Sequence, residues 1–257
     1  MSKIHPTAIV SGKAKLGKNI SVGPYAIIED DVEIGDDTSI GPHAVIYNGA
    51  RIGNKVTIHQ AASIAHIPQD LKFGNEETYF YVGDNCVIHE YVTLHRGTKE
   101  TGFSRIGSNC LLMAYSHVAH DTVVGNNCIL ANGVQLAGHV VLEDFVIIGG
   151  LTPVHQFCNV GKHCMIGGGF RVTQDVPPFI LTAGEPLKFS GLNLIGLRRR
   201  GFSNEDILLL KKAYGYLYDH SLNVSQAKEK IKAEIQSKYV DSLLEFLDKS
   251  KRGIVGK

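Results

Sequence analysis

The sequence lacks an excess of charge of either sign, because its 257 residues contain 26 Lys and Arg against 25 Asp and Glu. A chain with so little net charge creates no overall field that attracts nucleic acid or an anionic membrane. It also lacks any apolar run near the ~18 residues that a membrane span requires. The N-terminal MSKIHPTAIV has no charged-then-apolar layout of a signal peptide. We therefore expect a cytoplasmic protein with no nucleic-acid partner and no membrane insertion.

Patterns typical of metal sites and disulfide frameworks are missing as well. The five cysteines form no CxxC pair and no Cys/His spacing of the kind that holds zinc. The sequence therefore predicts no metal site and no cofactor.

What the sequence does contain is a repeat of period six. From Ile4 to Val172, 26 of the 29 positions spaced six residues apart hold Ile, Leu or Val. The three exceptions are Asp70, Glu76 and Glu100. This period fits neither an amphipathic helix nor a plain strand alternation, but it fits short strands joined by regular corners. The pattern predicts a mainly β solenoid with two loops, near 65–81 and 95–105, after which the repeat resumes in phase.

A second position, two residues before each aliphatic one, favours small or β-branched side chains. Residues two apart on a strand point to the same side, so both positions are expected to face the interior. This position holds all five cysteines, namely Cys86, Cys110, Cys128, Cys158 and Cys164. We expect them to be buried thiols without a redox or metal role.

Several hexapeptides resemble the repeat of left-handed parallel β-helix acyltransferases, among them VGNNCI, LANGVQ, LAGHVV and IGDDTS. The resemblance implies a left-handed β-helix in which three hexapeptides make one triangular coil of about 18 residues.

The composition changes after VPP (176–178). Ser203 followed by Asp206 is typical of a helix start, and apolar residues then recur at helical spacing. We expect a β-helix domain over 1–189 and a C-terminal α-helical domain over 190–257.

Coils of 18 residues place chemically related side chains above one another. His120 then lies under Gly138 and Gly138 under Gln156, while Asp121 lies below His139. A neutral imidazole can take a proton from a hydroxyl, and a carboxylate can fix its tautomer. A glycine lets a backbone N–H approach an oxyanion. We therefore expect acyl transfer, with His120 as general base, Asp121 as its partner if the corner turns it that way, and the Gly138 N–H as oxyanion donor.

Segments outside the repeat carry a closer resemblance, to the UDP-N-acetylglucosamine O-acyltransferases that begin lipid A biosynthesis. These segments are PQDLKF, VTLHRGT, SHVAHDTVVGNNCILANG, LAGHV, VHQF, QDVPPF and LNLIGLRRRGFS. The resemblance implies a homotrimer that takes a 3-hydroxyacyl group from acyl carrier protein and passes it to UDP-N-acetylglucosamine. It implies that His120, Asp121 and Gly138 are catalytic. It also implies substrate contacts for Gln69, Asp70, Lys72, His117, His139, His155, Gln156, Gly168, Asn193, Arg199 and Arg200.

Two departures from the family pattern bear on specificity. Ile195 stands where many members carry an acidic residue, which changes the expected nucleotide contacts. Gly168 matches the position that limits acyl length and predicts room for a long chain, but Phe170 and Arg171 follow where small residues are common.

Three alternative functions remain open on the sequence. The acceptor can be a 3-amino UDP-sugar, which gives an amide instead of an ester. A zinc enzyme of the carbonic-anhydrase type can be built on the same fold from three histidines. A solenoid can also bind a flat partner without catalysis. The acyltransferase that acts later in the pathway is less consistent with repeats that begin at Ile4, because its members carry an additional N-terminal domain.

Overall fold

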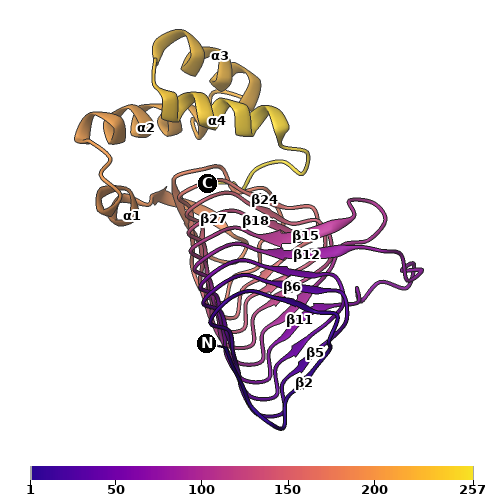
Figure 1. The fold of residues 1–257 in the computed structure, drawn as a ribbon. Helices are drawn as coiled ribbons and strands as arrows, with labels where there is room; N and C mark the ends of the chain where they lie inside the picture. The colour runs from indigo at the N-terminus through magenta and orange to yellow at the C-terminus, as the bar shows by residue number, and fades with distance from the viewer. Residues whose placement is uncertain (1, 257) are drawn as a thin grey trace.

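The computed structural model describes residues 2–256, and most of them form a three-sided prism of stacked coils (Figure 1). Each side of the prism is a sheet of strands that are all parallel except β27, and each coil contributes one short strand to each sheet. The first sheet contains β1 Lys3–Ile4, β4 Ser21–Val22, β7 Ser39–Ile40, β10 Thr57–Ile58, β13 Val87–Ile88, β16 Leu111–Leu112, β19 Ile129–Leu130, β22 Ile147–Ile148, β25 Met165–Ile166, β26 Ile180–Ala183 and β27 Lys188–Leu192. The second contains β2 Ile9–Val10, β5 Ile27–Ile28, β8 Val45–Ile46, β11 Ser63–His66, β14 Thr93–His95, β17 His117–Val118, β20 Gln135–Leu136 and β23 Pro153–Val154. The third contains β3 Lys15–Leu16, β6 Val32–Ile34, β9 Ala50–Ile52, β12 Tyr79–Val82, β15 Phe103–Ile106, β18 Val123–Val124, β21 Val141–Leu142 and β24 Asn159–Val160.

Two coils are longer than the others, and each carries a loop. Most paired residues are 18 apart, but Thr57 pairs with Val87 and Tyr79 pairs with Phe103. The extra lengths are 12 and 6 residues, both multiples of the repeat, so the predicted return in phase is confirmed. We call 67–78 the first loop and 96–102 the second loop.

The interior of the prism is a continuous apolar column. The aliphatic positions of the repeat are buried from Val22 to Val172, and all five cysteines are buried free thiols, as predicted. Burial raises the pKa of Cys158 to about 11, so this thiol stays protonated near neutral pH. The cysteines therefore act as small apolar residues.

The three edges of the prism have different chemistry. We call the edge from the first to the second sheet the first corner, the next one the second corner, and the edge from the third back to the first sheet the third corner. At the third corner, a side-chain oxygen from one coil accepts the backbone N–H of the preceding coil. The pairs are Lys18 to Asp36, Asp36 to Asn54, Asn54 to Asp84, Asp84 to Ser108, Ser108 to Asn126 and Asn126 to Asp144. This ladder satisfies N–H groups that the strands leave unpaired.

The chain leaves the prism through an antiparallel hairpin, β26–β27, which the sequence analysis did not anticipate. Helices α1 Leu194–Arg199, α2 Asn204–Leu217, α3 Val224–Glu234 and α4 Lys238–Lys249 follow at the end of the prism that lies farthest from the N-terminus (Figure 1). Ser203 and Asp206 form the capping box of α2, so the predicted helix start is confirmed. Val255 then donates its N–H to the Asp175 carbonyl and ties the C-terminal segment to the prism. The division at 189/190 into two domains stays a prediction.

Within residues 2–256, no helix has the length and apolar character that crossing a membrane requires.

The ladder at the third corner predicts a measurable stability effect. Ser108→Ala leaves the Asp84 N–H without its acceptor, which lies 3.1 Å away. We expect a loss of about 1 kcal/mol of unfolding free energy, seen as a lower midpoint of thermal unfolding. Ser108→Asn is the matched control, because asparagine fills the equivalent rung at Asn54 and Asn126. Equal midpoints for the Ala and Asn variants would contradict this role.

Candidate active site

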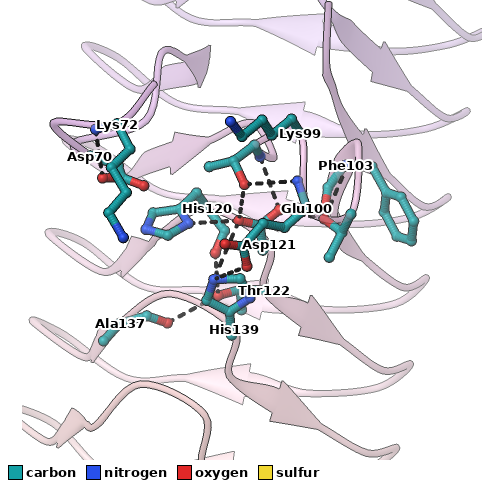
Figure 2. A network of polar contacts seen from close by, with 12 residues as sticks. Asp70, Lys72, Lys99, Glu100, Phe103, His120, Asp121, Thr122, Ala137 and His139 are labelled. Atoms are coloured by element: carbon teal, nitrogen blue, oxygen red, sulfur yellow. Dashed lines mark hydrogen bonds and ion pairs between the residues drawn. The ribbon is translucent and has the colours of Figure 1, made fainter. Parts of the chain in front are cut away.

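The second corner between β17 and β18 turns His120 and Asp121 toward each other. Asp121 has a φ of 58°, in the left-handed region that a regular strand does not use. Its Oδ2 lies 2.7 Å from His120 Nδ1 (Figure 2). The contact that the sequence analysis made conditional on a corner conformation is therefore present.

The Asp121 carboxylate is enclosed and fully hydrogen-bonded. Its side chain has no exposed surface. Thr98 donates its N–H over 2.9 Å and its hydroxyl over 2.8 Å, and the Thr101 hydroxyl donates a third bond. Burial raises the pKa of Asp121, but the hydrogen bonds from His120, Thr101 and Thr98 outweigh it and hold the pKa well below its ordinary value. Asp121 is therefore an ionised acceptor at neutral pH.

This carboxylate fixes the tautomer of His120. An ionised carboxylate can only accept a hydrogen bond, so Nδ1 of His120 must carry the proton. The Nε2 atom then keeps its lone pair. The hydrogen bond with Asp121 raises the pKa of His120, burial lowers it, and the charge of Asp121 raises it further, with a net upward shift. The half-buried imidazole is thus a strengthened base with its basic nitrogen directed away from Asp121.

Gly138 lies directly against this imidazole, as the predicted stack requires. A Cβ atom on Gly138 would come within 2.6 Å of His120 Cε1 and 2.7 Å of Nε2. The Gly138 N–H is buried and has no acceptor among residues 2–256, whereas the equivalent N–H groups of the third corner are bonded to side chains. A free donor therefore lies beside the basic nitrogen, which is the arrangement that a developing oxyanion needs.

Two further histidines border the pair. His139 Nε2 lies 3.6 Å from Asp121 Oδ2 and 3.5 Å from Glu100 of the second loop, and its ring stacks on Phe157. His117 Nδ1 lies 2.7 Å from the Thr93 hydroxyl. Burial lowers the pKa of His117, and so does the nearby His120. His117 therefore stays neutral at physiological pH.

An apolar groove of about 430 Å³ begins next to these histidines. It follows the second sheet from His117 past Gln135 and Pro153 to Arg171. Gly168 is not among the described residues that line it. A Cβ at Gly168 would instead come 3.0 Å from the Gly150 carbonyl oxygen, so the predicted effect of Gly168 on acyl length stays a prediction.

The first loop brings Asp70 and Lys72 to the side of His120 (Figure 2). Asp70 Oδ1 accepts the Lys72 N–H over 3.0 Å, and the charge of Asp70 contributes to the raised pKa of His120. Gln69 is exposed in the same loop. The structure therefore brings two of the three predicted first-loop residues, Asp70 and Lys72, close to His120.

His155 and Gln156 lie on the next coil, and both are exposed. His155 is part of the groove lining, and its Nδ1 lies 3.0 Å from the Gln156 carbonyl oxygen. Gln156 follows Gly138 by one coil at the second corner, as the stack predicted.

The remaining predicted residues lie elsewhere on the chain. Asn193 caps α1, where its side chain accepts the Gly196 N–H and donates to the His163 carbonyl at the third corner. Arg200 packs its guanidinium over Phe145, also at the third corner. Arg199 and Ile195 are exposed on α1, which lies on the opposite side of the prism from the two loops (Figure 1). One chain therefore does not bring Asn193, Arg199 and Arg200 together with His120.

Residues that the sequence analysis missed lie in the second loop. Thr98 and Thr101 bind Asp121, and Glu100 approaches His139. Glu76 of the first loop accepts the Lys99 N–H and so joins the two loops. A signal existed for the acids, because Glu76 and Glu100 interrupt the period of six. The threonines gave no signal, because their positions depend on the path of the loop.

The described residues include one group with the potential to hold a metal ion, formed by His120, Asp121 and His139. Their ligand atoms lie within 4.8 Å of one another. The Asp121 oxygens, however, already accept bonds from Thr98, Thr101 and His120, and His120 turns Nδ1 toward Asp121. This donor set favours a hydrogen-bonded catalytic pair over a tetrahedral zinc site.

Comparisons with known proteins agree with this geometry. The family described as bacterial transferase hexapeptide matches residues 13–48, 31–66 and 103–138. The family described as UDP-N-acetylglucosamine O-acyltransferase, domain 2, matches residues 175–255. The repeats, the left-handed parallel β-helix and the histidine site define a hexapeptide-repeat acyltransferase.

Individual relatives specify the family further. A protein of Aliarcobacter butzleri is 51% identical, covers 99% of this chain and 98% of its own, and is named acyl-acyl-carrier-protein–UDP-N-acetylglucosamine O-acyltransferase. The crystal structure of a UDP-N-acetylglucosamine acyltransferase from Bacteroides fragilis superposes with a TM-score of 0.97 at 45% identity, covering 98% of this chain and 99% of that one. The corresponding Arabidopsis enzyme is 32% identical, with a TM-score of 0.81 and coverage of 99% and 100%. The chain belongs to the UDP-N-acetylglucosamine O-acyltransferase family.

The contact between Gly138 and His120 predicts the effect of one methyl group. Gly138→Ala would push the imidazole out of place, because the added Cβ would overlap its ring. We expect the acyl-transfer rate to fall on the order of 100-fold, the loss that a misplacement near 1 Å can cause. Gly12→Ala is the matched control, because Gly12 occupies the same corner position and a Cβ there meets nothing within 4 Å. A fully active Gly138→Ala enzyme would contradict the described packing.

Proposed function

We propose that this protein transfers a 3-hydroxyacyl group from acyl carrier protein to the 3-hydroxyl of UDP-N-acetylglucosamine, the first step of lipid A biosynthesis. His120 is the general base. The observation that carries this proposal is the hydrogen bond of His120 Nδ1 with Asp121, which leaves Nε2 free beside the unbonded N–H of Gly138. Full-length relatives named for this reaction support the same substrates.

The reaction proceeds by direct attack. Nε2 of His120 takes the proton of the 3-hydroxyl while the oxygen attacks the thioester carbonyl carbon. The negative charge that develops on the carbonyl oxygen accepts the Gly138 N–H. When the tetrahedral intermediate collapses, the carbon–sulfur bond breaks, and the leaving thiolate takes the proton from the imidazolium and departs as the thiol. Asp121 stays ionised and stabilises the imidazolium between these two steps.

The other predicted residues bind the substrates. Lys72 supplies a cation for the diphosphate, and Arg199 and Arg200 supply planar donors for the nucleotide. The groove, whose lining includes Ala137 and Pro153, takes the apolar acyl chain. The remaining substrate contacts are assigned to Gln69, Asp70, His117, His139, His155, Gln156, Gly168 and Asn193.

A homotrimer completes this site. Asn193, Arg199 and Arg200 are attached near the third corner, whereas His120 lies at the second corner. A neighbouring copy that places its third corner beside the second corner of this chain would bring the two sets together. We propose the cytoplasm as the compartment, since acyl carrier protein is the donor.

The first test compares wild type with His120→Ala in the transfer of a 3-hydroxyacyl group from acyl carrier protein. We expect the wild type to acylate UDP-N-acetylglucosamine and the variant to lose roughly 10²- to 10⁴-fold in rate, because the general base is gone. A folded variant that keeps its activity would refute His120 as the base.

The acceptor is tested in the same assay with a 3-amino analogue of the UDP-sugar. If the wild-type protein acylates only the amine, the proposed product becomes an amide in place of an ester. The same residues would support that reaction. Metal analysis of the purified protein tests the zinc alternative. One bound zinc per chain together with carbonic anhydrase activity would favour that alternative.

Complementation tests the shared site. A chain with Arg199→Ala and Arg200→Ala is expected to be inactive, as is the His120→Ala chain. In mixed trimers, one kind of boundary joins an intact His120 to intact arginines, so we expect co-expression to restore a fraction of the wild-type activity. Co-expressed chains that stay as inactive as each parent would contradict a site between subunits. Size-exclusion chromatography with light scattering gives the oligomeric state of every sample.

A further inference from the structure

The second loop donates more hydrogen bonds to the Asp121 carboxylate than the coil that carries Asp121 does. Thr98 is 5% exposed and uses both its N–H and its hydroxyl on Asp121, one on each carboxylate oxygen. The Thr101 hydroxyl donates to Oδ1, the oxygen that also receives the Thr98 N–H. Three of the four donors to Asp121 thus come from one six-residue insertion in the repeat.

From this network we infer that Thr98 and Thr101 are positioning residues, which fix the Asp121 carboxylate so that it binds His120. The inference deepens the proposed function and rests on His120 being the base. Neither threonine touches the reacting atoms, so each acts through Asp121.

A competing partner explains why the carboxylate needs this support. Asp121 Oδ2 lies 2.7 Å from His120 Nδ1 but only 3.6 Å from His139 Nε2. A carboxylate free to rotate can bond either imidazole. The Thr98 hydroxyl on Oδ2 and the two donors on Oδ1 hold the plane of the carboxylate in the orientation that serves His120.

The second loop also braces the first loop. Glu76 accepts the Lys99 N–H over 3.0 Å with one oxygen and the Gly74 N–H over 2.7 Å with the other. The first loop carries Asp70 and Lys72 toward His120 (Figure 2). The second loop, which orients Asp121 and through it His120, is therefore hydrogen-bonded to the first loop, to which substrate contacts are assigned.

The test compares Thr98→Val with Thr98→Ser, and Thr101→Val with Thr101→Ser. Valine keeps the shape of threonine but removes the hydroxyl, whereas serine keeps the hydroxyl. The readouts are kcat, the KM for UDP-N-acetylglucosamine, and the pH dependence of kcat/KM. Besides Asp121, the titratable groups around His120 are Asp70, His95, Glu100, His117 and His139, and all of them are unchanged in the four variants.

We expect each valine variant to lose on the order of 10-fold in kcat, the usual effect of removing an outer hydrogen-bond partner, with little change in KM. The acidic limb of the pH profile is expected to move to lower pH. The reason is that the hydrogen bond with Asp121 is the main cause of the raised pKa of His120, and a loosened bond raises it less. Asp121→Asn should move the limb in the same direction, and the serine variants should restore both kcat and the limb.

Several outcomes would overturn the inference. One is a valine variant with wild-type kcat and pH profile. Another is a loss of activity that leaves the limb in place, which would indicate a purely structural role. If Thr98→Val does not fold, the Thr101→Val and Thr101→Ser variants test the inference, because Thr101 is exposed. Failure of the proposed function looks different, because His120→Ala would then be as active as wild type whatever happens at Thr98.

Discussion

Backbone hydrogen bonds between successive coils, most of them 18 residues apart, hold the second corner of this protein in register. They fix the register in which His120 lies against Gly138 and Asp121 lies beside His139. A shift of one residue would turn the aliphatic positions outward and expose the core, so burial of that core enforces the register. The same apolar column that stabilises the prism therefore aligns His120, Asp121 and Gly138, although none of them is part of it.

The corners of the prism differ from the strands in backbone conformation and in the pairing of their N–H groups. Left-handed backbone at Asp121, His139 and Phe157 costs roughly 1–2 kcal/mol per residue, and the stacked coils offset this cost. At the third corner, side-chain oxygens satisfy the free N–H groups and make the edge structural. At the second corner the Gly138 N–H stays unbonded among the described residues, and the edge is available for chemistry. The Gly138 rung of the second corner thus differs from the ladder of the third corner in leaving its N–H unpaired among the described residues.

The sequence predicted the parts of the structure that repeat. The period of six led to a β-solenoid and to the buried cysteines, and the 18-residue coil that the family resemblance implied led to the stack of His120 under Gly138. Neither led to Thr98 and Thr101, because a loop that leaves the repeat has no periodicity from which its path can be read. The hairpin β26–β27 was missed for the same reason. Asn193 shows another limit, since its motif indicated a substrate contact while its side chain here caps α1. Only an assembly of several chains can bring that region near His120, and one sequence does not describe an assembly.

The central claim is that Asp121 prepares His120 as a base by holding the proton on Nδ1. The most direct measurement is a pH titration of the ¹⁵N resonances of His120 in the assembled protein, with the signals assigned by comparison with a His120→Gln variant. The account predicts that neutral His120 carries its proton on Nδ1 and that its pKa lies above the ordinary value of about 6.5. A neutral ring protonated on Nε2, or a pKa below the ordinary value, would contradict it.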